Sequence, residues 1–135
     1  MQVLPGMLTD HPANAITAAV IGAAIEVHRY LGPGLIESAY ERCLLYEIHH
    51  SGLHFVTQVR IPLKYKEVNL DCGFKLDLVV EDQVIVELKA VEQLAWIHEA
   101  QLLTYLRLTG KKVGLIINFN VPVLKHGIRR VMNTK

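Results

Sequence analysis

The chain has 135 residues, which is the size of one ordinary domain with a substantial buried core. Hydrophobic residues make up 51% of the sequence, charged residues make up 20%, and the mean hydropathy is +0.27. This composition excludes a disordered or collagen-like chain. We therefore expect a single domain over residues 1–135, in which residues 1–13 form an N-terminal extension.

The formal net charge is +1, so the overall balance of charge requires neither a nucleic acid nor an anionic membrane as partner. The distribution of charge is uneven, because no acidic residue follows position 110. The basic C-terminal tail is then either a surface for a polyanion or a solvated chain end. Its cationic residues are Lys111, Lys112, Lys125, Arg129, Arg130 and Lys135.

Cys43 and Cys72 are far apart and not in a metal-binding spacing, so a disulfide scaffold and a zinc ribbon have no support. We expect both to be small core residues. The most apolar stretch, residues 15–25, is too short to cross a bilayer. The sequence predicts a soluble protein of a reducing compartment, the cytoplasm, without a membrane partner.

Two helices are expected first. Apolar residues at intervals of three and four predict a helix over 14–31, capped by Asn14 and ended by Gly32-Pro33-Gly34. A second helix is predicted over 35–50, before Ser51-Gly52. Its apolar stripe comprises Ile36, Ala39, Tyr40, Cys43 and Leu44.

The apolar period then changes to two, which predicts strands. The first covers residues 55–65, and Pro62 within it indicates an edge position or a break. The second covers residues 70–80, with Phe74, Leu76 and Leu78 expected on one face. A turn at residues 81–83 leads into a third strand over 84–90, which completes a hairpin with acidic residues on one side.

A third helix is predicted over 92–108, followed by a doubly buried strand over 113–118 and one short strand or turn near 128–131. The element order is ααβββαβ. We expect an α/β (α+β) fold with a mixed central sheet flanked by helices.

The polar residues of this pattern converge. Glu87 and Lys89 project from the same face of one strand, and Asp77 on the neighbouring strand can share that face. Gln101 and Tyr105 lie one turn apart on the third helix. Each feature alone is common: Glu87 and Lys89 could form an exposed cross-strand pair, and Gln101 with Tyr105 a helix-surface pair. Their joint order is what suggests a site for a divalent cation and a phosphate.

This order resembles a known family. Gly34-Leu35-Ile36-Glu37-Ser38-Ala39-Tyr40 matches the motif of the GxxExxY protein family, and the stretch from Gly114 to Asn120 is also typical of it. Asp77, Glu87-Leu88-Lys89 and Gln101 through Tyr105 resemble the PD-(D/E)XK nuclease-like superfamily, to which that family is assigned. The residue before Asp77 is Leu76 instead of proline. The resemblance implies a restriction-endonuclease-like core.

The resemblance also implies a mechanism. Asp77, Glu87, the Leu88 carbonyl and Glu37 would bind Mg²⁺ (or Mn²⁺), whose preference for oxygen ligands suits this set. The substrate would be DNA or RNA, cleaved by an activated water. Lys89 would orient the water or stabilise developing charge. Gln101 and Tyr105 would position a backbone phosphate or support the site.

Other interpretations remain open at this stage. The histidines lack the spacing of zinc ligands, and for His28 and His98 we expect packing or solvent-facing roles. One alternative is a nucleic-acid-binding module without turnover. Another is an interaction or structural protein whose acids form ion pairs. In a chain this small, specificity would come from a homodimer or a partner protein.

Overall fold

The computed structural model describes residues 13–134, so the predicted N-terminal extension lies outside the described part except for Ala13. The elements follow the predicted order, with a 3-10 turn in addition, and the short segment expected near 128–131 is a fifth strand. They are α2 (Asn14–Leu31), α3 (Glu37–His50), β1 (Phe55–Tyr65), β2 (Val68–Val80), β3 (Val84–Lys89), α4 (Trp96–Thr109), β4 (Val113–Asn118), η1 (Leu124–Gly127) and β5 (Ile128–Met132).

The five strands form one mixed sheet in the order β1-β2-β3-β4-β5. Strands β3 and β4 are parallel, and the other three neighbouring pairs are antiparallel. The parallel pair needs a crossover, which α4 provides. The predicted α+β architecture with a mixed sheet is therefore confirmed, and it agrees with a restriction-endonuclease-like fold.

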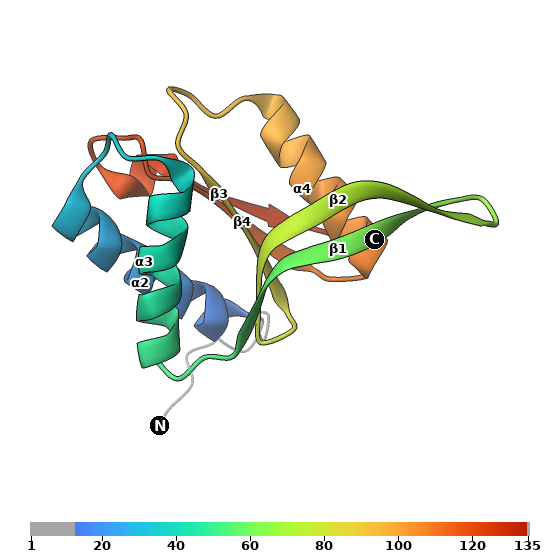
Figure 1. The fold of residues 1–135 in the computed structure, drawn as a ribbon, viewed down its shortest axis with the longest axis horizontal. Helices are drawn as coiled ribbons and strands as arrows, with labels where there is room; N and C mark the ends of the chain where they lie inside the picture. Colours follow the sequence, from blue (N-terminus) through green and yellow to red (C-terminus); the bar gives the residue numbers. More distant parts are fainter. Residues whose placement is uncertain (1–12, 135) are drawn as a thin grey trace.

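Helices cover both faces of the sheet (Figure 1). Helices α2 and α3 pack on one face, in a core that includes Tyr40, Leu44 and the alternate residues of β3 and β4. Helix α4 covers the other face, in a smaller core built around Leu102, Leu106 and Ile116. Strands β3 and β4 are buried on both faces, as the apolar run over 113–118 predicts.

The helix starts differ from the prediction. Ala13 is the N-cap of α2 and Asn14 is its first helical residue, so the expected cap is wrong. The Asn14 side chain instead accepts a hydrogen bond from Arg130 of β5. Helix α4 begins at Trp96 and not at position 92, because the Ala95 N–H bonds to the ring of His98 and starts the helix there.

Strand β1 is an edge strand, and its register with β2 shifts between Ile61 and Leu63, so both expectations from Pro62 are confirmed. The expected shared face of Phe74, Leu76 and Leu78 is wrong. Leu78 packs in the α2–α3 core, whereas Leu76 is buried in the α4 core with Phe74 packed against it. The alternation of side chains along β2 is therefore broken between Leu76 and Leu78, so that residues two apart face opposite cores.

A backbone feature coincides with this change of face. Gln58 of β1 lies between the paired positions Thr57↔Leu78 and Val59↔Leu76, which places it opposite Asp77. Its φ angle is 50°, a left-handed conformation that is uncommon for a residue with a side chain. Such a residue within a strand adds local twist, which accounts for the change of face.

The cysteines are less buried than expected. Cys43 is half-buried and Cys72 is exposed, so the prediction of a core position is wrong for Cys72. Both are free thiols. Among residues 13–134, none of the helices has the length and apolar character required to cross a membrane.

Candidate active site

The centre of the site is a reciprocal contact between Asp77 and Glu87. The ladder between β2 and β3 stops at the pair Leu78↔Val86. At the next position the Asp77 N–H donates to Glu87 Oε1 (3.2 Å), and the Leu88 N–H donates to Asp77 Oδ2 (2.9 Å). Two carboxylates thus replace the main-chain hydrogen bonds of the ladder, and they are held side by side.

This contact makes Glu87 a strongly perturbed acid. Glu87 is 7% exposed. Burial first, and then the charge of Asp77 and a side-chain hydrogen bond to it, raise the pKa of Glu87 to about 9, although the charge of Lys89 opposes the change. Two close carboxylates with little solvent between them favour sharing a proton over full ionisation. Perturbation of this kind is typical of functional sites.

Tyr105 brings α4 into the same electrostatic environment. Its side chain is 7% exposed, and its ring lies 6.1 Å from the Phe74 ring between centroids. Burial, followed by the charges of Glu87 and Asp77, raises the pKa of the Tyr105 phenol. The phenol is therefore protonated at neutral pH, where it can donate a hydrogen bond.

Glu37 approaches the pair from α3. It is the first residue of that helix, and burial and the nearby Asp77 raise the pKa of its carboxyl, while Lys89 lowers it. Glu37, Asp77, Glu87 and Lys89 therefore interact across β2, β3 and α3. Within residues 13–134, no three His, Cys, Asp or Glu side chains are close enough together to hold a metal ion as they stand.

The motif around Glu37 has a structural explanation. The Tyr40 hydroxyl donates to the Gly32 carbonyl (2.6 Å) and accepts from the Leu35 N–H (3.1 Å). Tyr40 thereby fixes the loop that leads into α3. Gly34, with φ 104°, has a conformation that residues with side chains rarely adopt. The glycine and the tyrosine of the motif thus set where the glutamate between them begins its helix.

The end of β4 supports the other side of the site. The Asn118 side chain is 1% exposed; it accepts from the Val91 N–H (3.0 Å) and donates to the Val91 carbonyl (2.9 Å). The next residue, Phe119, donates its N–H to the Lys89 carbonyl (3.0 Å) and stacks on Tyr40, with centroids 4.5 Å apart. One segment therefore contacts both the chain after Lys89 and the tyrosine that fixes the loop before Glu37.

The remaining predicted residues are placed as follows. Gln101 is exposed on α4, one turn before Tyr105. The Leu88 N–H points to Asp77, and the N–H and C=O of one residue in an extended strand point to the same side. The Leu88 carbonyl is thus directed toward the space where β2 leaves β3, on the side of the Asp77 carboxylate.

Two residues near the site were not predicted. Gln58 lies opposite Asp77 on β1, and its amide donates to Glu41 Oε1 (3.3 Å). Glu41 also contributes to the raised pKa of Glu37, one turn before it on α3. Glu41 could have been found from its spacing to Glu37. Gln58 could not, because its position depends on the left-handed φ within β1.

His28 and His98 both make contacts within the protein, as expected. The buried His28 ring nitrogen Nε2 lies 2.8 Å from the Val121 carbonyl oxygen, which joins α2 to the segment after β4. His98 accepts the Ala95 N–H (3.0 Å) at the start of α4.

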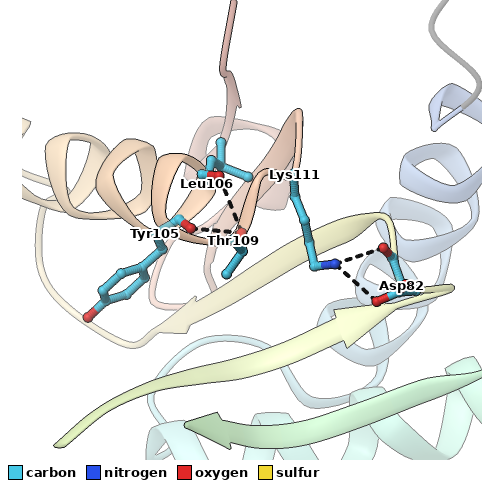
Figure 2. A network of polar contacts seen from close by, with 5 residues as sticks. All are labelled: Asp82, Tyr105, Leu106, Thr109 and Lys111. Carbon is cyan, nitrogen blue, oxygen red and sulfur yellow. Dashed lines mark hydrogen bonds and ion pairs between the residues drawn. The ribbon is translucent and has the colours of Figure 1, made fainter. Parts of the chain in front are cut away.

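Part of the basic C-terminal tail is engaged in internal contacts. Lys111 donates to the carbonyl oxygen (2.9 Å) and carboxylate (3.0 Å) of Asp82 in the β2–β3 turn, as Figure 2 shows. In that view the Tyr105 ring points away from this ion pair. Arg129 lies 3.6 Å from Glu99. Lys135 lies outside the described residues.

Comparison with known proteins agrees with this geometry. A family model described as the PD-(D/E)XK nuclease superfamily matches residues 14–131. The chain belongs to the PD-(D/E)XK nuclease superfamily. The searches of curated proteins and of solved structures gave no match. The match covers every described helix and strand except the last residue of β5. Glu37, Asp77 and Glu87 therefore all lie within the matched region.

Nucleases of this superfamily generally use divalent metals, and the oxygen donors of the site are of the type that such an ion prefers. The set contains the two carboxylates of Asp77 and Glu87, with the Leu88 carbonyl directed toward them. Oxygen donors alone suit Mg²⁺ or Mn²⁺ better than zinc. Burial first, and then the neighbouring charge of Asp77, raise the pKa of Glu87, and a cation bound between the two acids would lower it.

Proposed function

We propose that this superfamily member is a nuclease that hydrolyses phosphodiester bonds of nucleic acid with Mg²⁺ or Mn²⁺ as cofactor. The observation that carries the proposal is the pair Asp77 and Glu87 at the point where β2 leaves β3, where Glu87 accepts the Asp77 N–H and Asp77 accepts the Leu88 N–H. In a protein without such a function, a buried Glu87 carboxylate beside the carboxylate of Asp77 would only oppose folding.

Each residue has a part in the proposal. Asp77, Glu87 and the Leu88 carbonyl would hold the ion, and Glu37 would complete the set from α3. The bound ion would neutralise the scissile phosphate and lower the pKa of a water molecule. Lys89, whose charge acts on both Glu37 and Glu87, would orient the attacking water or offset developing negative charge.

Helix α4 contributes donors. The Tyr105 phenol is protonated at neutral pH, as an ordinary phenol is, and its raised pKa keeps it so at higher pH; it can therefore donate to a phosphate oxygen next to the acids. Gln101, one turn away and exposed, is available to a longer stretch of the same strand. The roles of both residues are binding and positioning of the substrate.

A cleavage assay tests the proposal. Purified protein is incubated with labelled DNA and RNA in Mg²⁺, in Mn²⁺ and in EDTA. Glu87→Ala and Lys89→Ala should abolish metal-dependent cleavage while circular dichroism shows a retained fold. Glu92→Ala, an exposed acid in the loop before α4, is the matched control and should cleave normally. Absence of cleavage by the wild type in every divalent metal would contradict the catalytic proposal.

Calorimetry with Mn²⁺ tests the ion site separately. The wild type should bind the ion and Glu87→Ala should not. If both bind equally, the acids are not the ligands. Nucleic-acid binding without ion binding or cleavage would instead favour the non-catalytic module.

Three finer assignments accompany the proposal. The GxxExxY family assignment is supported by the way Gly34 and Tyr40 place Glu37. We also propose a cytoplasmic location, in keeping with the two free thiols. A homodimer or partner protein as the source of specificity is proposed from the small size of the chain.

A further inference from the structure

The β1–β2 hairpin extends beyond the rest of the sheet. Strands β1 and β2 have 11 and 13 residues, whereas β3, β4 and β5 have 6, 6 and 5. Strand β2 pairs with β3 only over Leu78–Val80. The part of the hairpin outside this pairing, residues 59–76, is named here the hairpin arm. Figure 1 shows it projecting past the body of the protein.

The arm is amphipathic. Residues directly opposite each other in an antiparallel pair share a face. Ile61 and Phe74 are such a pair, and both contact the α4 core. The adjacent pair, Arg60 and Lys75, therefore lies on the other face. The register with β2 shifts between Ile61 and Leu63, but along β1 buried Ile61 and half-buried Leu63 still alternate with exposed Pro62 and Lys64, so Lys64 lies on the same face as Arg60. Arg60, Lys64 and Lys75 are all exposed.

These three cations form a track that starts at the site. Lys75 is two residues from Asp77, a distance of about 7 Å along the strand, and Arg60 is its cross-strand partner. Lys64 lies about 13 Å farther toward the tip. Arg60 forms an ion pair with Asp71 at 3.8 Å. Both side chains are exposed, so a phosphate can readily replace Asp71 as the partner of Arg60.

The composition of this face favours a duplex over a single strand. Binding of single strands relies on aromatic side chains that stack with unpaired bases. The aromatic residues of the arm, Phe74 and Tyr65, lie on the opposite face, because Phe74 packs with α4 and Tyr65 alternates with Lys64. A two-stranded ribbon also has the width that the major groove of B-form DNA admits.

We infer that the substrate is double-stranded nucleic acid, whose phosphates are contacted by Arg60, Lys64 and Lys75 on the hairpin arm. This inference rests on the proposed nuclease function, since it names the substrate of that site. The arm then holds the duplex along a track of about 20 Å that begins beside Asp77.

Fluorescence anisotropy of the full chain, without divalent metal, tests the inference independently of cleavage. The probes are labelled duplex DNA and duplex RNA of about 30 base pairs, longer than the arm, and one single strand of the same length. The test variant is Arg60→Ala/Lys64→Ala/Lys75→Ala. The control is Arg42→Ala/Arg107→Ala/Lys125→Ala, which removes the same charge from exposed positions on α3, α4 and η1.

We expect the test variant to bind a duplex on the order of 100-fold more weakly at 0.1 M salt, with a salt slope lower by about two to three, since each lost phosphate contact removes about 0.9. The control should lose far less, and the single strand should be affected less than the duplex. Which duplex responds more identifies DNA or RNA.

Two results would overturn the inference: equal losses for the test and control variants, or a loss confined to the single strand. Failure of the nuclease proposal would be seen in the cleavage assay instead: the wild type would bind a duplex through the arm but would not cleave it.

Discussion

Replacing Glu87 by glutamine should make the metal-free protein more stable. The pKa of Glu87 is about 9 in the folded protein, against 4.5 as the ordinary value. Between these values the folded state binds a proton that the unfolded state has lost, so the contribution of Glu87 to stability is most favourable below pH 4.5 and falls as the pH rises toward 9. Glutamine imitates the protonated acid and keeps an oxygen for the Asp77 N–H.

The size of the effect follows from the same values. At 1.36 kcal/mol per pH unit, a shift from 4.5 to about 9 opposes folding at pH 8 by at most about 5 kcal/mol. Relaxation and water entry around the two carboxylates reduce this, and we expect about 2 kcal/mol. For a domain of this size that corresponds to a rise in Tm of roughly 6 °C.

Thermal and urea unfolding in EDTA at pH 8 and pH 5 measure the effect. The gain of Glu87→Gln should be large at pH 8 and small at pH 5, and the variant should lose metal-dependent cleavage. Glu81→Gln is a control of opposite sign, because the His54 N–H lowers the pKa of Glu81, so this change should not stabilise. If Glu87→Gln is no more stable than wild type at pH 8, the electrostatic reasoning is wrong.

Three further substitutions test the parts that support the site. Tyr40→Phe, which removes both hydroxyl hydrogen bonds to the loop before α3, should cost about 1–2 kcal/mol in urea unfolding and also reduce cleavage. Asn118→Ala should cost about 2–3 kcal/mol, since Val91 loses both of its side-chain partners; a cost below 0.5 kcal/mol would contradict this. Gly127→Ala should prevent folding or cost more than about 3 kcal/mol, because its Cβ would lie 2.1 Å from the Asn118 carbonyl oxygen. Gly114→Ala meets only side-chain atoms, at 2.8 Å, and should cost about 1–2 kcal/mol; equal costs for the two glycines would refute the comparison.

Most elements could be predicted from the sequence because their signals are local. Alternation of apolar residues gave the strands, Pro62 indicated the edge position of β1, and the glycines after α2 and α4 gave the helix ends. Helix starts were less predictable. Asn14 is a favourable capping residue, but tertiary contact with Arg130 places it inside the helix instead.

The proximity of Asp77 and Glu87 was also within reach of the sequence, because the short turn between β2 and β3 fixes the register that places them opposite each other. What could not be read was the change of face in the hairpin, which depends on the left-handed Gln58. The expected common face of Phe74, Leu76 and Leu78 failed for that reason. The hydrogen bonds of the Asn118 side chain likewise could not be predicted, because their partner Val91 is distant in the sequence and no local pattern encodes the contact.

The change of face has a consequence for how the protein unfolds. Because β1 and β2 contribute to the α4 core with Ile61 and Leu76 and to the opposite core with Leu78 and Val80, detaching this edge hairpin would expose both cores together. Neither half of the molecule then has a complete hydrophobic interior of its own. We expect a single cooperative transition, with coincident loss of near-UV and far-UV circular dichroism and no stable half-folded species.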